Sequence, residues 1–143
     1  MKLNLSQIDF QQHEMAITRA YEILSATGPG ALHQDQTKSF HVGATKTLHF
    51  LNPELFIIVD SNAAKAFRIA CSLPFKDSTQ PGFGAGLYLR CMEQARTDIA
   101  TFGLKQFQSL EPDIPLTRIY DKLTFITGEE HKEKDSLPDN CPT

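Results

Sequence analysis

The amino-acid sequence predicts an all-α domain, built as an orthogonal bundle of five or six helices. Apolar residues recur at steps of three and four in several segments, and clusters of glycine and proline separate these segments. No segment alternates apolar and polar residues as a half-buried strand does. With 143 residues, 41% of them hydrophobic, the chain is long enough to bury one core. We therefore expect one helical domain without an internal repeat.

The first helix is predicted over residues 6 to 25. Ser6 can accept an N-cap hydrogen bond, and Asp9 lies near the positive end of the helix dipole. The apolar residues that share one face of this helix are Ala16, Ile17, Ala20, Ile23 and Leu24. The Gly-Pro-Gly sequence that begins at Gly28 then prevents the helix from continuing.

The second helix is predicted to begin near Val42 or Gly43 and to end before Pro53. Asn52 can cap a helix and proline is favoured at the first helical position, so a short helical turn is expected to follow. The apolar run at residues 56 to 59 matches either a buried strand or an extended segment that crosses the core. Because no other segment resembles a strand, we favour the extended segment.

A dense group of capping residues begins at Asp60 and predicts a third helix that ends near Leu73. A loop rich in glycine and proline is expected over residues 76 to 86. The fourth helix is predicted to begin at Leu87 and to end at Gly103.

The last part of the chain predicts a short helix at residues 104 to 110 and a longer helix that opens at residues 113 to 115. We expect Gly128 to close this helix. The segment after it carries an excess of acidic residues, two prolines and almost no apolar residues, whereas the rest of the chain is balanced in charge. The sequence therefore predicts a helical domain over residues 1–127 and a disordered acidic tail over residues 128–143.

Composition excludes several classes of protein. No apolar run approaches the roughly 20 residues that cross a bilayer, and the N-terminus has no apolar stretch typical of a secretory signal, so we expect a cytoplasmic protein without membrane contact. The three cysteines are widely spaced, and we interpret them as reduced thiols. The five histidines lack the spacing of a metal site and are interpreted as surface or capping residues, so no metal and no cofactor are expected.

From His41 to Arg68 the chain carries a glycine and a Lys-Thr pair at the start of one predicted helix, and then an apolar run that leads to a Val-Asp pair at the start of the next. This pattern resembles the helix-hairpin-helix DNA glycosylase superfamily. The resemblance implies a helix-hairpin-helix-like centre, with Gly43 in the hairpin. It also implies that Lys46 matches the lysine nucleophile of bifunctional members and that Asp60 matches the catalytic aspartate.

Each of these two residues also has a purely structural interpretation. An aspartate that caps a helix is held ionised by the dipole and by backbone donors, so Asp60 could stabilise the positive sugar formed when a glycosidic bond breaks. Asp60 could equally be an N-cap alone, and Lys46 could be a solvated lysine on a helix.

The glycosylase interpretation also names the residues expected at a DNA interface. Those expected to contact DNA are Gly43, Thr45, Lys46, Lys65 and Arg68, and Lys38 adds to the same basic segment. The aromatic residues that could stack on an extruded base are Phe40, Phe83, Tyr88 and Tyr120.

A second resemblance covers most of the predicted domain. The chain is similar to uncharacterised bacterial helical domains that share a Lys-x-Leu-His-x-x-x-Pro-x-x-Phe-x-x-x-Asp core, which here runs from Lys46 to Asp60, and an Arg-x-x-Asp terminal helix, here Arg118 and Asp121. Arg118 and Asp121 can also pair on one helix face without forming a site.

Two hypotheses follow from these patterns. One is a DNA-interacting domain related to helix-hairpin-helix DNA glycosylases, with DNA as the partner and, if the domain is an enzyme, glycosylase or lyase chemistry. The other is a noncatalytic helical module that binds a protein or a small ligand.

Overall fold

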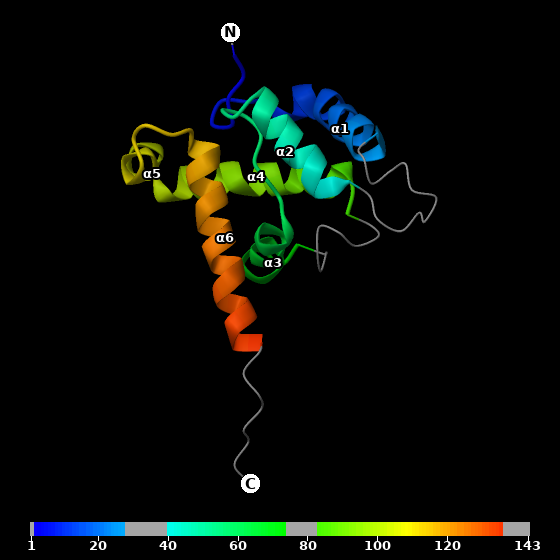
Figure 1. Cartoon of the computed structure of the whole chain (residues 1–143). Helices are drawn as coiled ribbons and strands as arrows, with labels where there is room; N and C mark the ends of the chain where they lie inside the picture. The colour runs from blue at the N-terminus through cyan, green and yellow to red at the C-terminus, as the bar shows by residue number, and fades with distance from the viewer. Residues whose placement is uncertain (1, 28–39, 74–82, 136–143) are drawn as a thin grey trace.

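The structure is a computed structural model that describes residues 2–27, 40–73 and 83–135. This part of the chain contains six helices and no strand, which confirms the all-α bundle predicted from the sequence (Figure 1). The helices are α1 (Phe10–Thr27), α2 (His41–Leu51), α3 (Ser61–Cys71), α4 (Ala85–Phe102), α5 (Leu104–Leu110) and α6 (Leu116–Asp135).

The first helix begins later than predicted. The predicted N-cap at Ser6 is wrong, because the Asp9 carboxylate accepts the capping hydrogen bond from the Gln12 backbone N–H at 3.2 Å. Leu5 and Ile8 are buried in the core. Their burial holds the chain before Asp9 in a non-helical turn, so the helix can start only after it.

The buried face of α1 matches the predicted face in part. Ile17 is buried as expected, and Ala20 and Leu24 are partly buried, but Ala16 and Ile23 are exposed. Tyr21, which the predicted face omits, is almost fully buried and stacks on Tyr88 with ring centroids 5.0 Å apart. A tyrosine has a large apolar ring, and here the ring decides its burial.

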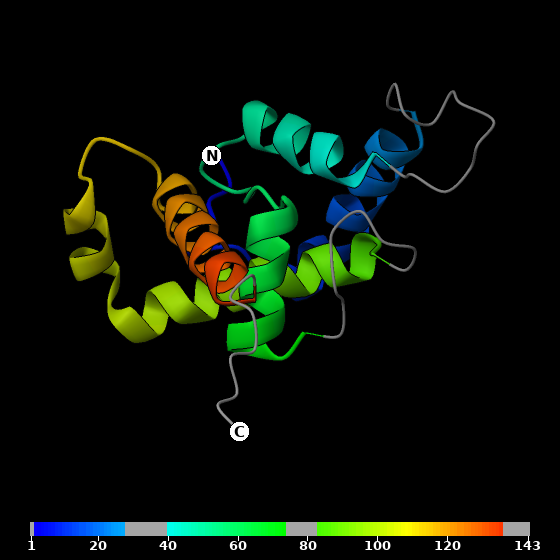
Figure 2. The ribbon, with the colours of Figure 1, turned by 60° about the horizontal axis from the view of Figure 1, so that its bottom comes forward.

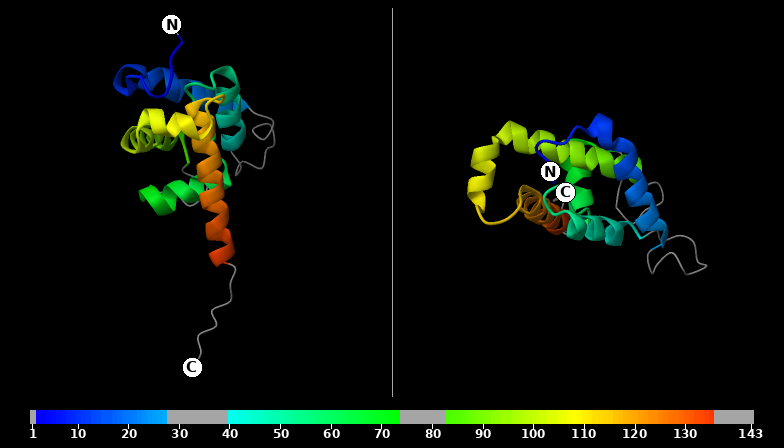
Figure 3. Two further views of the ribbon diagram at one scale, coloured as in Figure 1. Left: turned by 90° about the vertical axis from the view of Figure 1, so that its left-hand side faces the viewer. Right: turned by 90° about the horizontal axis from the view of Figure 1, so that it is seen from above.

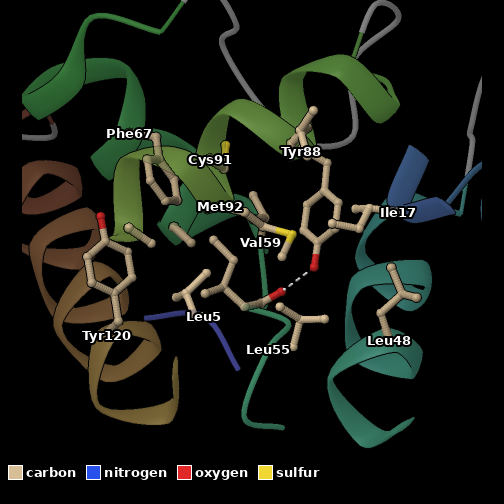
Figure 4. Packing of buried hydrophobic residues seen from close by; sticks show 14 of the residues in the cluster. Leu5, Ile17, Leu48, Leu55, Val59, Phe67, Tyr88, Cys91, Met92 and Tyr120 are labelled. Atoms are coloured by element: carbon tan, nitrogen blue, oxygen red, sulfur yellow. Dashed lines mark hydrogen bonds between the residues drawn. The ribbon is translucent and has the colours of Figure 1, made fainter. Parts of the chain in front are cut away.

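The predicted second helix, turn and extended segment are confirmed. Residues 53–55 form a turn, and residues 56–60 run through the core without strand pairing. Ile57 and Val59 are fully buried, and their backbone groups bind side chains of neighbouring helices. The Tyr88 hydroxyl donates to the Ile57 carbonyl at 2.9 Å (Figure 4). The Val59 N–H donates to the Thr45 hydroxyl at 3.2 Å. These bonds replace the sheet ladder that an extended segment otherwise needs.

The capped ends of the third and fourth helices lie close to the positions predicted from the sequence. Asp60 caps α3 as predicted, since its side chain accepts the Ala63 N–H at 2.9 Å. The C-cap of α3 is Ser72, and α4 ends at Gly103 as predicted. At its other end, α4 begins at Ala85 rather than at Leu87, with Gly84 in the extended N-cap conformation; residues 74–82 lie outside the described part.

The last helix corrects two predictions. Gly128 does not end α6, which continues to Asp135, so the first half of the predicted disordered tail is helical. The glycine is needed for contact with α3, because a Cβ at Gly128 would lie 2.1 Å from the Asn62 carbonyl oxygen. Residues 136–143 of the predicted tail lie outside the described part.

Helix packing arranges the bundle around one hydrophobic core. α1 packs on both α2 and α4, and α6 packs mainly on α3. Figures 1 and 3 show α6 crossing α4 transversely, which is the packing of an orthogonal bundle. In Figure 2, α2, α3 and α6 face one another around the extended segment that joins α2 to α3. This part of the bundle holds the candidate site.

Candidate functional site

A pocket of about 880 Å³ lies between α2, the start of α3 and α6. Its floor includes the extended segment that enters α3. The lining residues combine charged, aromatic and aliphatic side chains: Lys46, His49, Phe50, Pro53, Ile58, Asp60, Ala63, Arg118, Asp121, Lys122, Phe125 and Ile126. The volume is within the range of small-ligand sites, which usually pair an apolar wall with a few convergent polar groups.

Helical spacing explains how residues far apart in the chain converge on this pocket. On α2, Lys46, His49 and Phe50 are three and four residues apart and therefore share one face. On α6 the lining residues follow the same period and form one stripe: Arg118, Asp121, Lys122, Phe125 and Ile126. Each stripe begins with a cation and reaches a phenylalanine, so the two helices present similar chemistry to the pocket from opposite sides.

The predicted catalytic residues Asp60 and Lys46 line the same pocket. Asp60 is half-buried, and one of its oxygens is occupied by the cap hydrogen bond from Ala63 N–H. This bond anchors the carboxylate at the N-terminus of α3. Lys46 is exposed on the facing helix. The structure therefore brings an anchored carboxylate and an accessible ammonium group to one site.

His49 lies at the polar end of the pocket and is largely buried, with 14% of its side chain exposed. Its Nδ1 atom lies 2.7 Å from the Phe56 carbonyl oxygen. Because a carbonyl only accepts hydrogen bonds, Nδ1 carries a proton, which makes Nε2 the ring nitrogen that can meet a ligand. The backbone contact thus selects both the tautomer and the orientation of the imidazole.

Asp121 lies beneath His49 and is 6% exposed. Its Oδ1 accepts the Ile58 backbone N–H at 2.9 Å, and its Oδ2, which has no hydrogen-bond partner in the described part of the chain, lies 3.9 Å from His49 Nδ1. Burial raises the pKa of the Asp121 carboxyl to about 8, although the Ile58 N–H and the Arg118 charge oppose the shift. At neutral pH this carboxyl is therefore mostly protonated.

The charge of the pocket follows from these protonation states. Lys46, Arg118 and Lys122 are cationic, and Asp60 is the ionised acid that faces them. Lys122 is partly neutralised by Glu111, whose oxygens lie 2.5 and 2.8 Å from its Nζ. With Asp121 protonated, the pocket has a net positive charge next to an apolar wall. This combination favours a ligand with one anionic group and one flat or apolar group.

The other predicted DNA contacts lie outside the pocket. Gly43 is within the first turn of α2, not in a preceding hairpin loop, and the Phe40 ring occupies the space where a Cβ would lie. Thr45 is fully buried and bonded within the core, so its hydroxyl does not reach a ligand on the surface. Lys65 and Arg68 lie on α3 away from the lining residues, and Lys38 lies outside the described part.

The aromatic residues of the pocket differ from those predicted to stack on a base. None of the four predicted residues lines the pocket, and three of them are buried: Phe83, Tyr88 and Tyr120. Phe50 and Phe125 line it instead and are 86% and 43% exposed. The spacing from Lys46 to Phe50 and from Arg118 to Phe125 could have identified them.

The interpretation of the histidines as surface or capping residues is wrong for His41. This side chain is buried and hydrogen-bonded to the Tyr21 hydroxyl, and burial lowers its pKa. It belongs to the core. In the described part of the chain, no group of three histidine, cysteine or acidic side chains could hold a metal ion, and no helix is long and apolar enough to cross a membrane.

Comparisons with protein-family models, with curated proteins and with solved structures found no match to this chain. A function is therefore proposed from the geometry of the pocket alone.

Proposed function

We propose that the chain is a DNA-interacting domain, related to the helix-hairpin-helix DNA glycosylases, whose pocket receives one unpaired or extruded nucleotide. The observation that carries this proposal is the convergence of Lys46 and Asp60, named from the sequence, on one pocket that also presents Arg118 and the exposed Phe50 ring. A nucleotide matches this pocket because it combines a phosphate with a flat base.

Each part of a nucleotide has a counterpart in the lining. Lys46 and Arg118 can contact phosphate oxygens, and the rings of Phe50 and Phe125 provide faces on which a base can stack. The sugar would lie between them, towards Asp60. Base stacking on an aromatic side chain contributes roughly 1–3 kcal/mol, which corresponds to about 5- to 150-fold in affinity.

The same placement supports a glycosylase or lyase reaction. When the bond between the sugar C1′ and the base breaks, its electron pair leaves with the base and the sugar becomes positive. The Asp60 carboxylate, anchored by the Ala63 N–H, can stabilise that charge. Water can then add to C1′ and give a proton to the departed base. Lys46 can add instead only as the neutral amine, after its ammonium group has given a proton to that base.

A noncatalytic ligand-binding module remains the second candidate function. The observation that favours it is the Asp60 cap, because the bond to Ala63 N–H explains this aspartate without any reaction. An assay of base release from damaged duplexes distinguishes the glycosylase or lyase function from the noncatalytic one. We expect Asp60→Asn to abolish release while leaving the melting temperature nearly unchanged; absence of release by the wild type from every duplex would assign the site to binding alone.

DNA binding itself is tested by fluorescence anisotropy with a fully paired duplex and with the same duplex carrying one bulged nucleotide. We expect tighter binding to the bulged duplex and affinity that falls steeply with salt. Lys46→Ala and Arg118→Ala should each weaken binding severalfold and reduce the salt slope by about 1. Phe50→Ala should remove most of the preference for the bulge.

Two matched variants control this experiment. Lys105→Ala removes an exposed lysine on α5 that does not line the pocket, and Leu51→Ala removes an exposed apolar side chain next to Phe50 that also does not line it. Both should bind like the wild type. Undetectable binding, equal affinity for the two duplexes, or equal losses in Lys46→Ala and Lys105→Ala would refute the proposal.

A further inference from the structure

The polar floor of the pocket contains two titratable groups that the proposed nucleotide contacts do not use. Asp121 Oδ2 is a buried carboxylate oxygen without a hydrogen-bond partner in the described part of the chain, and His49 Nδ1 lies 3.9 Å from it. Buried polar atoms in native proteins are nearly always hydrogen-bonded, so an unpaired carboxylate oxygen at a pocket floor requires an explanation.

The surroundings of the two groups determine how they can hold a proton. Oδ1 of Asp121 is fixed by the Ile58 N–H, and Nδ1 of His49 is fixed by the Phe56 carbonyl. Asp121 can take a proton on Oδ2, which leaves His49 Nε2 as an acceptor, or it can stay ionised while Nε2 carries that proton and can donate. These two arrangements contain the same number of protons and the same total charge, so the pair titrates as one unit.

We infer that His49 and Asp121 hold one shared proton at the floor of the pocket, and that a phosphate or sulfate group binds there by accepting a hydrogen bond from His49 Nε2 when this proton is on the imidazole. Oδ2 of Asp121 is buried, so the ligand meets the pair through His49, the more exposed member. The inference rests on the proposed function only for the identity of the anion as a DNA phosphate.

The charges around the pair explain why anion binding should depend on this proton. The groups that face Asp121 are His49 on α2, Asp60 at the start of α3, Tyr88 on α4 and Arg118 on α6, with Lys46 and Lys122 across the pocket. When the shared proton is lost, the floor carries two carboxylates and a neutral imidazole. Their charge opposes an anion held by Lys46 and Arg118, so binding and proton uptake are coupled.

Sulfate is a suitable probe, because it is an anion that does not titrate between pH 7 and 9. The experiment follows sulfate binding to the full chain through NMR chemical shifts at both pH values. With the Asp121 pKa at about 8, and binding only to the protonated pair, wild-type affinity should fall about tenfold from pH 7 to pH 9. The pH dependence of wild-type sulfate binding should be centred near pH 8, the pKa of Asp121.

Asp121→Asn keeps the acceptor for the Ile58 N–H but has no carboxyl to titrate, so its sulfate affinity should be the same at both pH values. His49→Gln should lose most sulfate affinity at pH 7. Asp113→Asn, a change at an exposed aspartate outside the pocket, should behave like the wild type.

Sulfate affinity that is equal at pH 7 and 9 in the wild type, or that falls equally in Asp121→Asn, would overturn the shared proton. Absence of sulfate binding at both pH values would overturn the inference that the pocket is an anion receptor. Sulfate binding with the expected pH dependence, together with no DNA binding, would support this inference and refute the proposed function.

Discussion

Thr45 shows how a single side chain positions the site from within the core. Its hydroxyl donates to the Val42 carbonyl at 3.0 Å, inside α2, and accepts the Val59 N–H at 3.2 Å, in the extended segment. The side chain is fully buried. It thus fixes α2 against the residue that precedes Asp60, and the distance between Lys46 and Asp60 across the pocket depends on this bond.

Replacement of Thr45 by valine should therefore destabilise the fold. The side chains have nearly the same shape, but valine leaves the buried Val59 N–H without an acceptor, at a cost of roughly 1–3 kcal/mol. Thr45→Ser keeps the hydroxyl, so its free energy of unfolding should fall less than that of Thr45→Val. Urea unfolding measures the difference. A valine variant as stable as the wild type would contradict the structural role of the hydroxyl.

At this scale, the sequence predicted the residues whose chemistry is visible in local order. Asp60 stands before a run of good helix formers, so its capping role could be predicted, and Lys46 was named from a local motif. The pairing of His49 with Asp121 could not be predicted, because the two residues are distant in the chain and meet only when α6 packs near α2. Their geometry depends on tertiary packing, which single-sequence patterns do not encode.

At the scale of elements, the contact between α3 and α6 depends on the absence of a side chain at Gly128. The α6 backbone approaches Asn62 so closely that a Cβ at Gly128 would lie 2.1 Å from its carbonyl oxygen and 2.8 Å from its Cα atom. Asn62 is itself buried near the start of α3. The close approach therefore positions both Asp60, the N-cap of α3, and the α6 stripe that lines the pocket.

Gly128→Ala should destabilise the protein although alanine is the better helix former. The added methyl group meets backbone rather than a flexible side chain, and such overpacking costs roughly 1–3 kcal/mol or more, against a gain of about 1 kcal/mol in helix propensity. Gly86→Ala is the matched control, because Gly86 is exposed on α4 and a Cβ added there would meet nothing within 4 Å. Thermal unfolding should show a lower Tm for the first variant and an unchanged or higher Tm for the second; the reverse order would contradict this contact.

Helix positions were predicted where capping or breaking residues act locally, as at Asp60 and Gly103. They were missed where packing overrides local preference. Ser6 is a good N-cap by composition, but Leu5 and Ile8 are buried and Asp9 is the N-cap, so the helix begins at Phe10. Gly128 is a good helix terminator by composition, but here glycine serves the contact with α3 and α6 continues past it.

On the scale of the whole molecule, the pocket is a consequence of how three elements meet above a completed core. The extended segment contributes Ile57 and Val59 to the core and leaves Ile58 at the pocket. The same segment offers backbone groups to the site, since the Phe56 carbonyl binds His49 and the Ile58 N–H binds Asp121. One segment therefore couples the stability of the fold to the protonation of the site.

This coupling predicts how the free energy of unfolding depends on pH. The Asp121 pKa is about 8 in the folded protein and near its ordinary value of 3.8 in the unfolded chain. Between these values the folded state holds a proton that the unfolded state has lost, so the contribution of Asp121 is favourable at low pH and is lost as pH rises. The loss should be on the order of 1 kcal/mol per pH unit between about pH 4 and pH 8.

Asp121→Asn isolates this contribution, because the amide keeps the Ile58 hydrogen bond without an ionisable carboxyl. In urea unfolding, the stability of the variant relative to the wild type should rise progressively from pH 5 to pH 8, by on the order of 1 kcal/mol per pH unit. Asp113→Asn, at an exposed position, should follow the wild type throughout. A stability difference between wild type and Asp121→Asn that stays constant from pH 5 to pH 8 would mean that the folded protein holds no additional proton through Asp121, and it would remove the basis for a shared proton with His49.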